Sequence, residues 1–330
     1  MTTNDDDINN RINDDSDAVD QVTTTTTTTN NTTTSNTSSN TIKELNDGMS
    51  ALDLLLKEGG QNRIITFCHD IDSTLNGGIA LGKLTEFCGV PGVGKTQMAF
   101  QLAVNASIPK EFFGVAGKAV YIDSEGGYSC TRLREIATHL SNHLQEIASE
   151  RSEKERDIAE QLSPDAILNN IFYYRVYHYL EQVALVNQLS SFLEINRDVR
   201  LIIVDSITYP FRKDFADMGL RTRLLLSMAQ NLLSIAEKYN VAVVVMNQLT
   251  TKVSNNNNNS NNNNNQTILV PALGDAWTHI CTYRMILYWK DRKRFCHLYK
   301  SPSFKSCHVP YQIDSMGIRG IEQQEEEEQD

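Results

Sequence analysis

A glycine-rich stretch followed by a lysine and a threonine is the clearest chemical signal in this chain. Residues 88–97 read CGVPGVGKTQ and match the pattern G-x-x-x-x-G-K-[ST] at every fixed position. In such a loop, successive backbone N–H groups converge on phosphate oxygens, and the following helix begins at the same point. We expect Lys95 to reach the β- and γ-phosphates of ATP and Thr96 to bind Mg²⁺. The residues expected to contact the nucleotide here are Gly89, Val90, Pro91, Gly92, Val93, Gly94, Lys95, Thr96 and Gln97.

Two carboxylates follow apolar segments that we expect to be strands. Asp205 comes directly after LIIV, so its side chain is expected at the carboxyl edge of a sheet, where it could hold Mg²⁺ together with Thr96. Glu125 lies just past AVYI, where a carboxylate can polarise an attacking water as a general base. Asp123 is nearer to that strand and is the competing candidate. A simple strand-end cap is the alternative interpretation of Asp205.

A side-chain amide closes a third apolar segment. Gln248 follows VAVVVM and Asn247, immediately before a stretch rich in asparagine. An amide at the carboxyl edge of a strand can bind the γ-phosphate and change position once that phosphate leaves. We therefore expect Gln248 to take part in catalysis and to couple the nucleotide state to the loop after it. The alternative is a strand-end cap.

The apolar segments are continuous rather than alternating, which is typical of strands covered by helices on both faces of a parallel sheet. The sequence therefore predicts an α/β fold with a mostly parallel central sheet. Near the C-terminus, TYRMILYW and RFCHLYK flank KDRK and predict an antiparallel hairpin that extends the sheet. The expected strands are 64–67, 84–87, 119–122, 171–174, 201–204 and 241–246. The expected helices begin at Lys95, 131, 177 and 222. Residues 149–161 are expected to form a solvated helix end or loop.

Most of the negative charge lies at the two ends of the chain. Residues 1–40 hold seven Asp, one Arg and no aromatic residue, and we expect them to be disordered. Residues 321–330 (IEQQEEEEQD) form an acidic tail. Each end carries −6, so the net charge of the rest is −11 − (−12) = +1. The overall acidity therefore does not exclude a local site for nucleic acid.

The remaining length fits one large domain. We expect a linker helix and leading strand in 41–84, and a core in 85–320 that carries an asparagine tract at 255–265 in a surface loop. Six cysteines without a C-x-x-C pair favour a reducing compartment. No secretory signal is visible, and no apolar run reaches the ~18 residues that span a bilayer, so no membrane partner is expected.

The motifs GVPGVGKTQ, YIDSEGG, LIIVDS and MNQLTTK, in this order, resemble those of the RecA-type recombinases of the eukaryotic branch. The resemblance extends through PALGDAWTHICTYRM and LYKSPS and covers about residues 48–316. A glutamate at the position of Glu125 is typical of RecA-like ATPases and not of P-loop kinases or GTPases. The resemblance implies a RecA-like P-loop ATPase core and is strongest to the accessory paralogues of the main strand-exchange enzyme.

The resemblance also implies roles for residues outside these motifs. Arg132 would stack on the adenine, and His279 would sense the nucleotide at a subunit interface. Ser301 and Pro302 would cap ATP bound by a neighbouring subunit.

Two loops would face DNA, at about 211–220 and 250–273. Their basic candidates, Arg212, Lys213 and Lys252, would contact phosphates rather than read bases.

Departures from the family pattern bear on assembly. The N-terminal helix–hairpin–helix domain has no counterpart here, and 41–84 contains no Phe-x-x-Ala polymerisation motif. Met218 stands where the main enzyme carries a basic residue. Lys300 stands where main recombinases carry an acidic residue, so its ammonium would replace a cation. These departures favour a subunit of a small hetero-oligomer over an autonomous filament.

The resemblance therefore implies a slow, DNA-dependent ATPase of the nucleus that uses ATP and Mg²⁺. It would assist loading of the main recombinase on single-stranded DNA during double-strand break repair and meiotic recombination. Its partners would be other recombinase-like paralogues, the main recombinase, and single-stranded or branched DNA. Two alternatives stay open: an autonomous filament-forming recombinase, and an ATP-binding scaffold without significant turnover. A ring helicase is disfavoured because the sequence shows no second domain.

Overall fold

The computed structural model describes residues 63–212, 215, 217–254, 266–271, 273 and 275–321. These residues belong to the second of two compact units of the chain, Leu56–Asp330, whereas the first, Met1–Leu55, lies outside the described residues. The expected N-terminal tail, residues 41–62 of the expected linker region and the asparagine tract also lie outside them. So does the acidic tail after residue 321.

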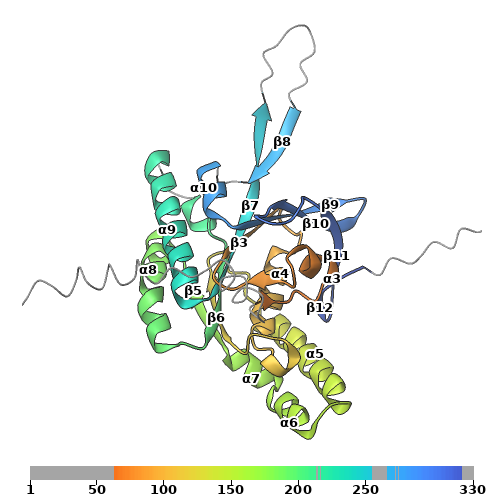
Figure 1. The fold of residues 1–330 in the computed structure, drawn as a ribbon. Coiled ribbons are helices and arrows are strands. Elements are labelled where there is room, and N and C mark those ends of the chain that lie inside the picture. The colour runs from red at the N-terminus through yellow and green to blue at the C-terminus, as the bar shows by residue number, and fades with distance from the viewer. Residues whose placement is uncertain are drawn as a thin grey trace, which may run out of the picture. The chain divides into compact units, whose positions relative to one another are not determined.

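Strands and helices alternate along most of the described chain (Figure 1). The strands are β1 (Arg63–Ile64), β2 (Ile79–Ala80), β3 (Leu84–Gly89), β4 (Lys118–Asp123), β5 (Ile171–Arg175), β6 (Val199–Asp205), β7 (Ala242–Ser254), β8 (Gln266–Pro271), β9 (Tyr283–Lys290), β10 (Lys293–Lys300), β11 (His308–Asp314) and β12 (Gly317–Arg319). The helices are α3 (His69–Thr74), α4 (Lys95–Asn105), α5 (Cys130–Ser149), α6 (Glu153–Gln161), α7 (Pro164–Asn169), α8 (Tyr179–Ile195), α9 (Met218–Tyr239) and α10 (Asp275–Ile280), with 3₁₀ turns at Lys110–Phe112 and Tyr209–Phe211.

The central sheet has the order β12-β11-β10-β9-β3-β7-β6-β4-β5, and β8 pairs with β7. Strands β9, β3, β7, β6, β4 and β5 are parallel to one another. Strands β10, β11 and β12 extend the sheet in antiparallel fashion. This architecture confirms the expected mostly parallel α/β core and the C-terminal hairpin, which is β9–β10.

Two apolar cores lie on opposite faces of the sheet. In β6, Leu201 and Ile203 join the core that contains α4 and α5, whereas Ile202 and Val204 join the core that contains α8 and α9. Because successive strand side chains point to opposite faces, a strand that is buried on both sides must be apolar throughout. This requirement explains the continuous apolar segments of the sequence.

Several expected elements differ from the structure. The strand expected at 241–246 continues as β7 to Ser254 and pairs with β8, so the expected DNA loop at 250–273 is in part a β-hairpin. The helix expected from 222 begins at Met218. Residues 153–161, expected to be a helix end or loop, form the separate helix α6, because Ser152 and Glu155 make a reciprocal capping box at its start. The leading strand is shorter than the expected 64–67 and ends at Ile64. Phe67 has a φ of 63°, a left-handed conformation that an extended strand cannot contain. Within the described residues, no helix is both long and apolar enough to cross a membrane.

Candidate nucleotide site

The glycine-rich loop lies between the end of β3 and the start of α4, as the sequence predicts. Gly94 has a φ of 114°, and a Cβ atom there would lie 2.4 Å from Cδ1 of Ile313, so only glycine fits without strain. The buried Lys95 Nζ donates hydrogen bonds to the carbonyl oxygens of Gly89 (3.0 Å) and Val90 (3.1 Å). Burial lowers the pKa of Lys95, and the carboxylates of Glu125 and Asp205 oppose this shift. The ammonium therefore lies over the loop that would hold phosphates.

The two expected metal ligands are in direct contact. Thr96 Oγ1 donates a hydrogen bond of 2.8 Å to Asp205 Oδ2, and the buried Tyr121 hydroxyl donates to the same oxygen at 2.9 Å. Burial raises the pKa of Asp205 to about 6, although both hydrogen bonds act in the opposite direction. A hydroxyl and a carboxylate are oxygen ligands that suit Mg²⁺, so this pair fits the metal that the sequence implies.

The structure gives Asp123 and Glu125 different surroundings. Asp123 is buried and accepts hydrogen bonds from the backbone of Gly126 (2.7 Å) and from the Tyr173 hydroxyl (3.2 Å), and it pairs with Arg175 at 3.6 Å. Its carboxylate is therefore occupied in holding the loop after β4. Glu125 is half-buried, and its carboxylate accepts a hydrogen bond only from Gln248 among the described residues. This arrangement favours Glu125 as the base.

Gln248 joins the nucleotide site to a buried polar network. Its Nε2 donates to Glu125 Oε1 at 2.9 Å, and its backbone N–H donates to Asn247 Oδ1 at 2.8 Å. Asn247 Nδ2 in turn donates to Glu86 Oε1 at 2.6 Å, and the Thr208 hydroxyl donates to Asn247 Oδ1 at 3.1 Å. The side chains of Asn247, Glu86 and Thr208 are buried.

The network continues to helix α10. Arg284 Nε donates to Glu86 Oε2 at 2.5 Å, and Arg284 Nη1 donates to Thr278 Oγ1 at 2.6 Å. Lys300 Nζ donates to the carbonyl oxygens of Thr278 (2.6 Å) and Cys281 (2.7 Å), at the end of the same helix. The Lys300 ammonium therefore satisfies terminal carbonyls of α10.

Arg132 and Gln97, both expected to contact the nucleotide, lie together beside the P-loop helix. Arg132 Nε donates to Gln97 Oε1 at 2.8 Å, and its Nη atoms donate to Glu135 and to the backbone carbonyls of Asp314 and Ser315. The guanidinium is thus held in one orientation by α4, α5 and the turn after β11.

The expected interface residues lie near the end of β10 and on α10. His279 is exposed on α10, next to the carbonyl that Lys300 binds. Ser301 follows Lys300, and its Oγ accepts hydrogen bonds from the backbone of Ser303 (3.2 Å) and Phe304 (3.1 Å). Pro302 is exposed. The two segments are linked through Lys300.

The expected DNA-facing cations are described only in part. Arg212 is exposed at the end of the 3₁₀ turn Tyr209–Phe211. Burial lowers the pKa of Arg221, and the nearby charge of Arg212 adds to this shift. Lys213 lies outside the described residues. Lys252 is in β7 opposite Ile268 of β8, and its side chain lies outside the described atoms.

The sequence analysis missed two groups that support the site. Tyr311 of β11 donates a hydrogen bond of 2.8 Å to the carbonyl oxygen of Val93, inside the P-loop. Nothing in its local sequence points to this contact. The other group is the Glu86–Arg284 pair. An acidic residue in the middle of the apolar strand LTEFCG was a usable signal, because a buried carboxylate requires a partner.

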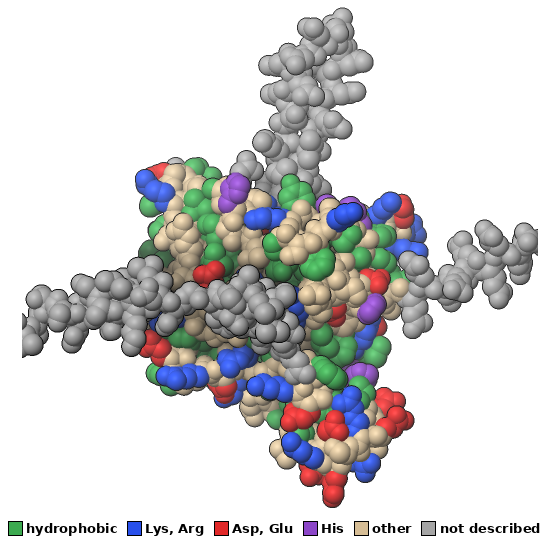
Figure 2. Space-filling model, in the orientation of Figure 1, with side chains coloured by type: hydrophobic (Ala, Val, Ile, Leu, Met, Phe, Trp, Pro, Cys, Tyr) green, Lys and Arg blue, Asp and Glu red, His purple; other side chains and the backbone are tan. Residues whose placement is uncertain are grey.

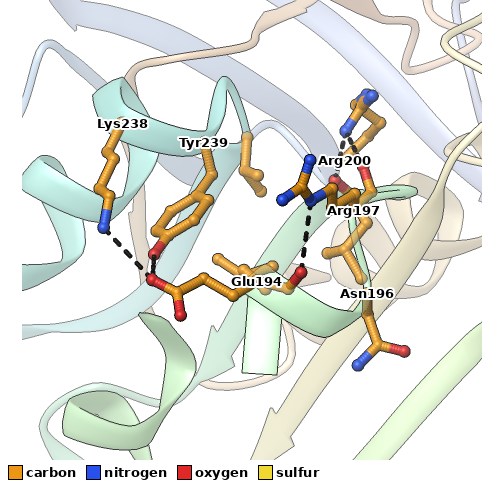
Figure 3. Close-up of a pocket in the computed structure, with 9 residues that line it drawn as sticks. Glu194, Asn196, Arg197, Arg200, Lys238 and Tyr239 are labelled. Carbon is orange, nitrogen blue, oxygen red and sulfur yellow. Dashed lines mark hydrogen bonds and ion pairs between the residues drawn. The ribbon is translucent and has the colours of Figure 1, made fainter. Parts of the chain in front are cut away.

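A separate hollow lies near the start of β6 and β7, at the edge of the sheet away from the P-loop (Figure 3). Its volume is about 620 Å³. Glu194 is 3.6 Å from Lys238 and accepts a hydrogen bond of 3.1 Å from the Tyr239 hydroxyl. Arg200 donates to backbone carbonyls at 2.8 and 2.9 Å. The charged groups of this hollow are thus largely paired within the chain, and no expected site residue lines it.

The chain is similar to known proteins over most of its length. The family model described as Rad51 matches residues 60–151 and 143–321. DNA repair protein RAD51 homolog 3 of Dictyostelium discoideum is 60% identical over 277 residues, covering 84% of this chain and 70% of that protein. The protein of the same name from Cricetulus griseus is 45% identical over 271 residues, covering 82% and 72%.

An archaeal relative is more distant. DNA repair and recombination protein RadA of Aeropyrum pernix is 32% identical over 209 residues, covering 62% of this chain and 59% of that protein. The two relatives named RAD51 homolog 3 confirm the expected resemblance to accessory paralogues, paralogue C in particular. Members of this family bind ATP with Mg²⁺ and hydrolyse it, and the relatives' names concern DNA repair and recombination. The chain therefore belongs to the Rad51 family, as a recombination-related paralogue of the RecA type.

Proposed function

We propose that this chain is an ATP-hydrolysing subunit of a recombinase-paralogue complex. It assists loading of the main recombinase on single-stranded DNA in the nucleus, in double-strand break repair and meiotic recombination. The observation that carries the proposal is the convergence of Lys95, Thr96, Asp205, Glu125 and Gln248 at one end of the parallel strands. A scaffold that only bound ATP would not need a carboxylate and an amide beside the phosphate-binding loop.

Each of these side chains has a distinct role in the proposed reaction. The backbone N–H groups of residues 89–96 and the Lys95 ammonium bind the phosphates. Glu125 accepts a proton from the attacking water, because its carboxylate is otherwise engaged only by Gln248 within the described chain. Thr96 and Asp205 hold Mg²⁺, which when bound neutralises charge on the phosphate oxygens. Gln97 and Arg132 orient the adenine side of the nucleotide.

The buried network supports a role for ATP in assembly. Gln248 contacts Glu125 on one side and Asn247 on the other, and the chain of contacts runs through Glu86 and Arg284 to α10. A movement of Gln248 on loss of the γ-phosphate would therefore reach the helix that carries His279. In this proposal His279, Ser301 and Pro302 meet a neighbouring subunit, and turnover is slow because ATP acts mainly as a switch.

DNA would be held by phosphate contacts from Arg212, Lys213 and Lys252 in the two loops. Such contacts are independent of base sequence and weaken steeply with salt. Burial and, to a smaller extent, the charge of Arg212 lower the pKa of Lys95, so DNA bound at Arg212 would lie near the phosphate-binding loop and would stimulate hydrolysis.

Isolation of the tagged chain from its own cells tests this proposal, with and without ATP. Near-equal recovery of other recombinase-like subunits, lost in Lys95→Ala but retained in Glu125→Gln, is the expected result. Recovery of the chain alone as a self-polymer would instead indicate an autonomous recombinase. Normal assembly and normal repair in both variants would indicate a scaffold. Phosphate release by the purified complex, measured with and without single-stranded DNA, tests the DNA dependence.

A further inference from the structure

The tip of the β9–β10 hairpin concentrates positive charge at one edge of the sheet. It carries four cations and one carboxylate, in the order Lys290, Asp291, Arg292, Lys293 and Arg294, for a net charge of +3. The first four of these residues are exposed. Figure 2 shows Lys and Arg side chains at the right-hand side of the molecule, where Figure 1 draws the end of this hairpin. We call residues 290–294 the basic tip.

The basic tip is not neutralised by the described part of the chain. None of its four cations forms an ion pair there, although other surface cations do, such as Lys118 with Asp198 at 2.7 Å. Arg294 lies over the ring of Trp289, 4.3 Å from its centroid, and so is held at the surface of the hairpin. A cluster of unpaired like charges on a rigid turn attracts anions.

Strand register brings the last described residues close to the basic tip. Arg294 of β10 lies opposite Tyr311 of β11, and the next residue, Gln312, lies opposite Arg319 of β12. Arg319 is therefore about level with the start of β10, two strands away. Neighbouring strands are about 4.8 Å apart, which puts the end of β12 roughly 10 Å from the basic tip. The chain then continues through residue 321.

The segment that follows has the opposite charge. Residues 322–330 read EQQEEEEQD and contain five Glu, one Asp and no cation. Nine extended residues reach about 30 Å, which is ample for a separation of about 10 Å. Salt screens the interaction between charges that are more than about 8 Å apart at physiological ionic strength. The attraction between the two segments therefore acts mainly when they are in direct contact. Chain length and charge thus both match the basic tip.

We propose that residues 322–330 dock on the basic tip of the same chain and mask it. The contact consists of carboxylates against Lys290, Arg292, Lys293 and Arg294, so it weakens as salt rises. An external polyanion that reaches the hairpin must then displace the acidic segment. The inference does not depend on the proposed recombination role, because it concerns two segments of one chain.

Zero-length crosslinking tests the contact in the full-length chain. A carbodiimide joins a carboxylate to a lysine amine only when the two touch. We expect crosslinked peptides between 322–330 and Lys290 or Lys293 at 50 mM salt, and their loss at 0.5 M. A mixture of isotope-labelled and unlabelled chains separates contacts within one chain from contacts between copies. Crosslinks between copies only, or crosslinks to other lysines only, would overturn the proposal.

Binding of a fluorescent 30-residue oligothymidine tests the masking. A variant with Glu325, Glu326, Glu327 and Glu328 changed to Gln should bind this probe about 3- to 10-fold more tightly at low salt. Neutralising the basic tip as well (Lys290→Gln, Arg292→Gln and Lys293→Gln) should remove that gain. The matched control changes the exposed Lys110 and Lys154, on other elements, to Gln and should leave the gain intact. Equal affinity of the tail variant and the unmodified chain, or no binding by either, contradicts masking.

Discussion

The side-chain amide of Gln248 donates a hydrogen bond of 2.9 Å to the carboxylate of Glu125, although 123 positions separate the two residues. The contact joins the middle of β7, at the point where its pairing with β3 ends, to the loop after β4, across the intervening strand β6. It holds the proposed base in place. It also makes the position of Glu125 depend on whatever moves Gln248.

Replacing Glu125 by Gln should slow ATP hydrolysis by about 10²- to 10⁴-fold, because the amide cannot accept a proton from water. Nucleotide affinity should change little, since the phosphates are held by the loop and Lys95. Phosphate release and binding of a fluorescent ATP analogue measure the two properties. Glu150→Gln, at the exposed end of α5, is the matched control. Unchanged turnover in Glu125→Gln would assign the base elsewhere.

Replacing Gln248 by Met should separate hydrolysis from its stimulation. Met keeps the length of the side chain but cannot bond Glu125 or a phosphate, so we expect basal turnover within a few-fold of normal and loss of stimulation by DNA. Steady-state hydrolysis with and without single-stranded DNA measures both. Gln145→Met on the exposed side of α5 serves as the control. Full stimulation in Gln248→Met would exclude this residue as the coupling element.

Asp205→Asn should stabilise the nucleotide-free protein at pH 7.5 while removing Mg²⁺-dependent activity. Burial raises the pKa of Asp205 to about 6 from an ordinary 3.8. Ionising the carboxyl group in the folded protein therefore lowers the free energy of unfolding, and this loss builds up between these two pH values and is complete above pH 6. Asn can still accept hydrogen bonds from Thr96 and Tyr121. The expected gain is about 1–3 kcal/mol at pH 7.5, and it should shrink as the pH falls from 6 to 4.

Urea unfolding over this pH range, without nucleotide or metal, measures the effect. The exposed Asp157→Asn should show no such gain. A destabilised Asp205→Asn would mean that the carboxylate is stabilised in the fold rather than strained.

Tyr311→Phe should lower both the stability of the protein and its affinity for ATP, although Tyr311 lies outside the P-loop. The substitution leaves the Val93 carbonyl without the hydroxyl 2.8 Å away, at a cost of about 1–2 kcal/mol in unfolding free energy. ATP affinity should fall several-fold because the P-loop loses the hydrogen bond that fixes the position of Val93. Thermal unfolding and equilibrium ATP binding test this, with the 52%-exposed Tyr299→Phe as control. Equal ATP affinity in both variants would show that the Tyr311 hydrogen bond does not position the P-loop for ATP.

Lys300 should determine the response to monovalent cations. Its ammonium binds the carbonyls of Thr278 and Cys281, so Lys300→Met should destabilise the protein by about 0.5–1.5 kcal/mol. Lys300→Asp places a carboxylate beside the same carbonyl oxygens. A bound cation between the carboxylate and the carbonyl oxygens is then needed to offset their repulsion. ATP turnover of this variant should depend on K⁺, whereas the unmodified chain and the exposed Lys305→Met should be indifferent to it. Turnover of Lys300→Asp that is equal in K⁺ and in its absence would refute this.

Much of the fold was predictable because its signals are local. Continuous apolar segments marked the parallel strands, and the hairpin was visible from two apolar stretches around KDRK. The errors were also local in origin. A capping box at Ser152 and Glu155 made a helix of a charged stretch, and a left-handed Phe67 shortened the first strand. The domain boundaries outside the described residues, and the roles assigned to site residues, stay predictions.

The sequence by itself determined the phosphate-binding loop and the residues at the ends of the apolar strands, because each of these depends on neighbours a few positions away. The tertiary structure alone decided which of those residues meet. Tyr311 reaches Val93 across 218 positions and Arg284 reaches Glu86 across 198, through a strand order in which β9 lies beside β3. Strand order follows from how all the helices and strands pack together, and no local spacing of residues encodes it.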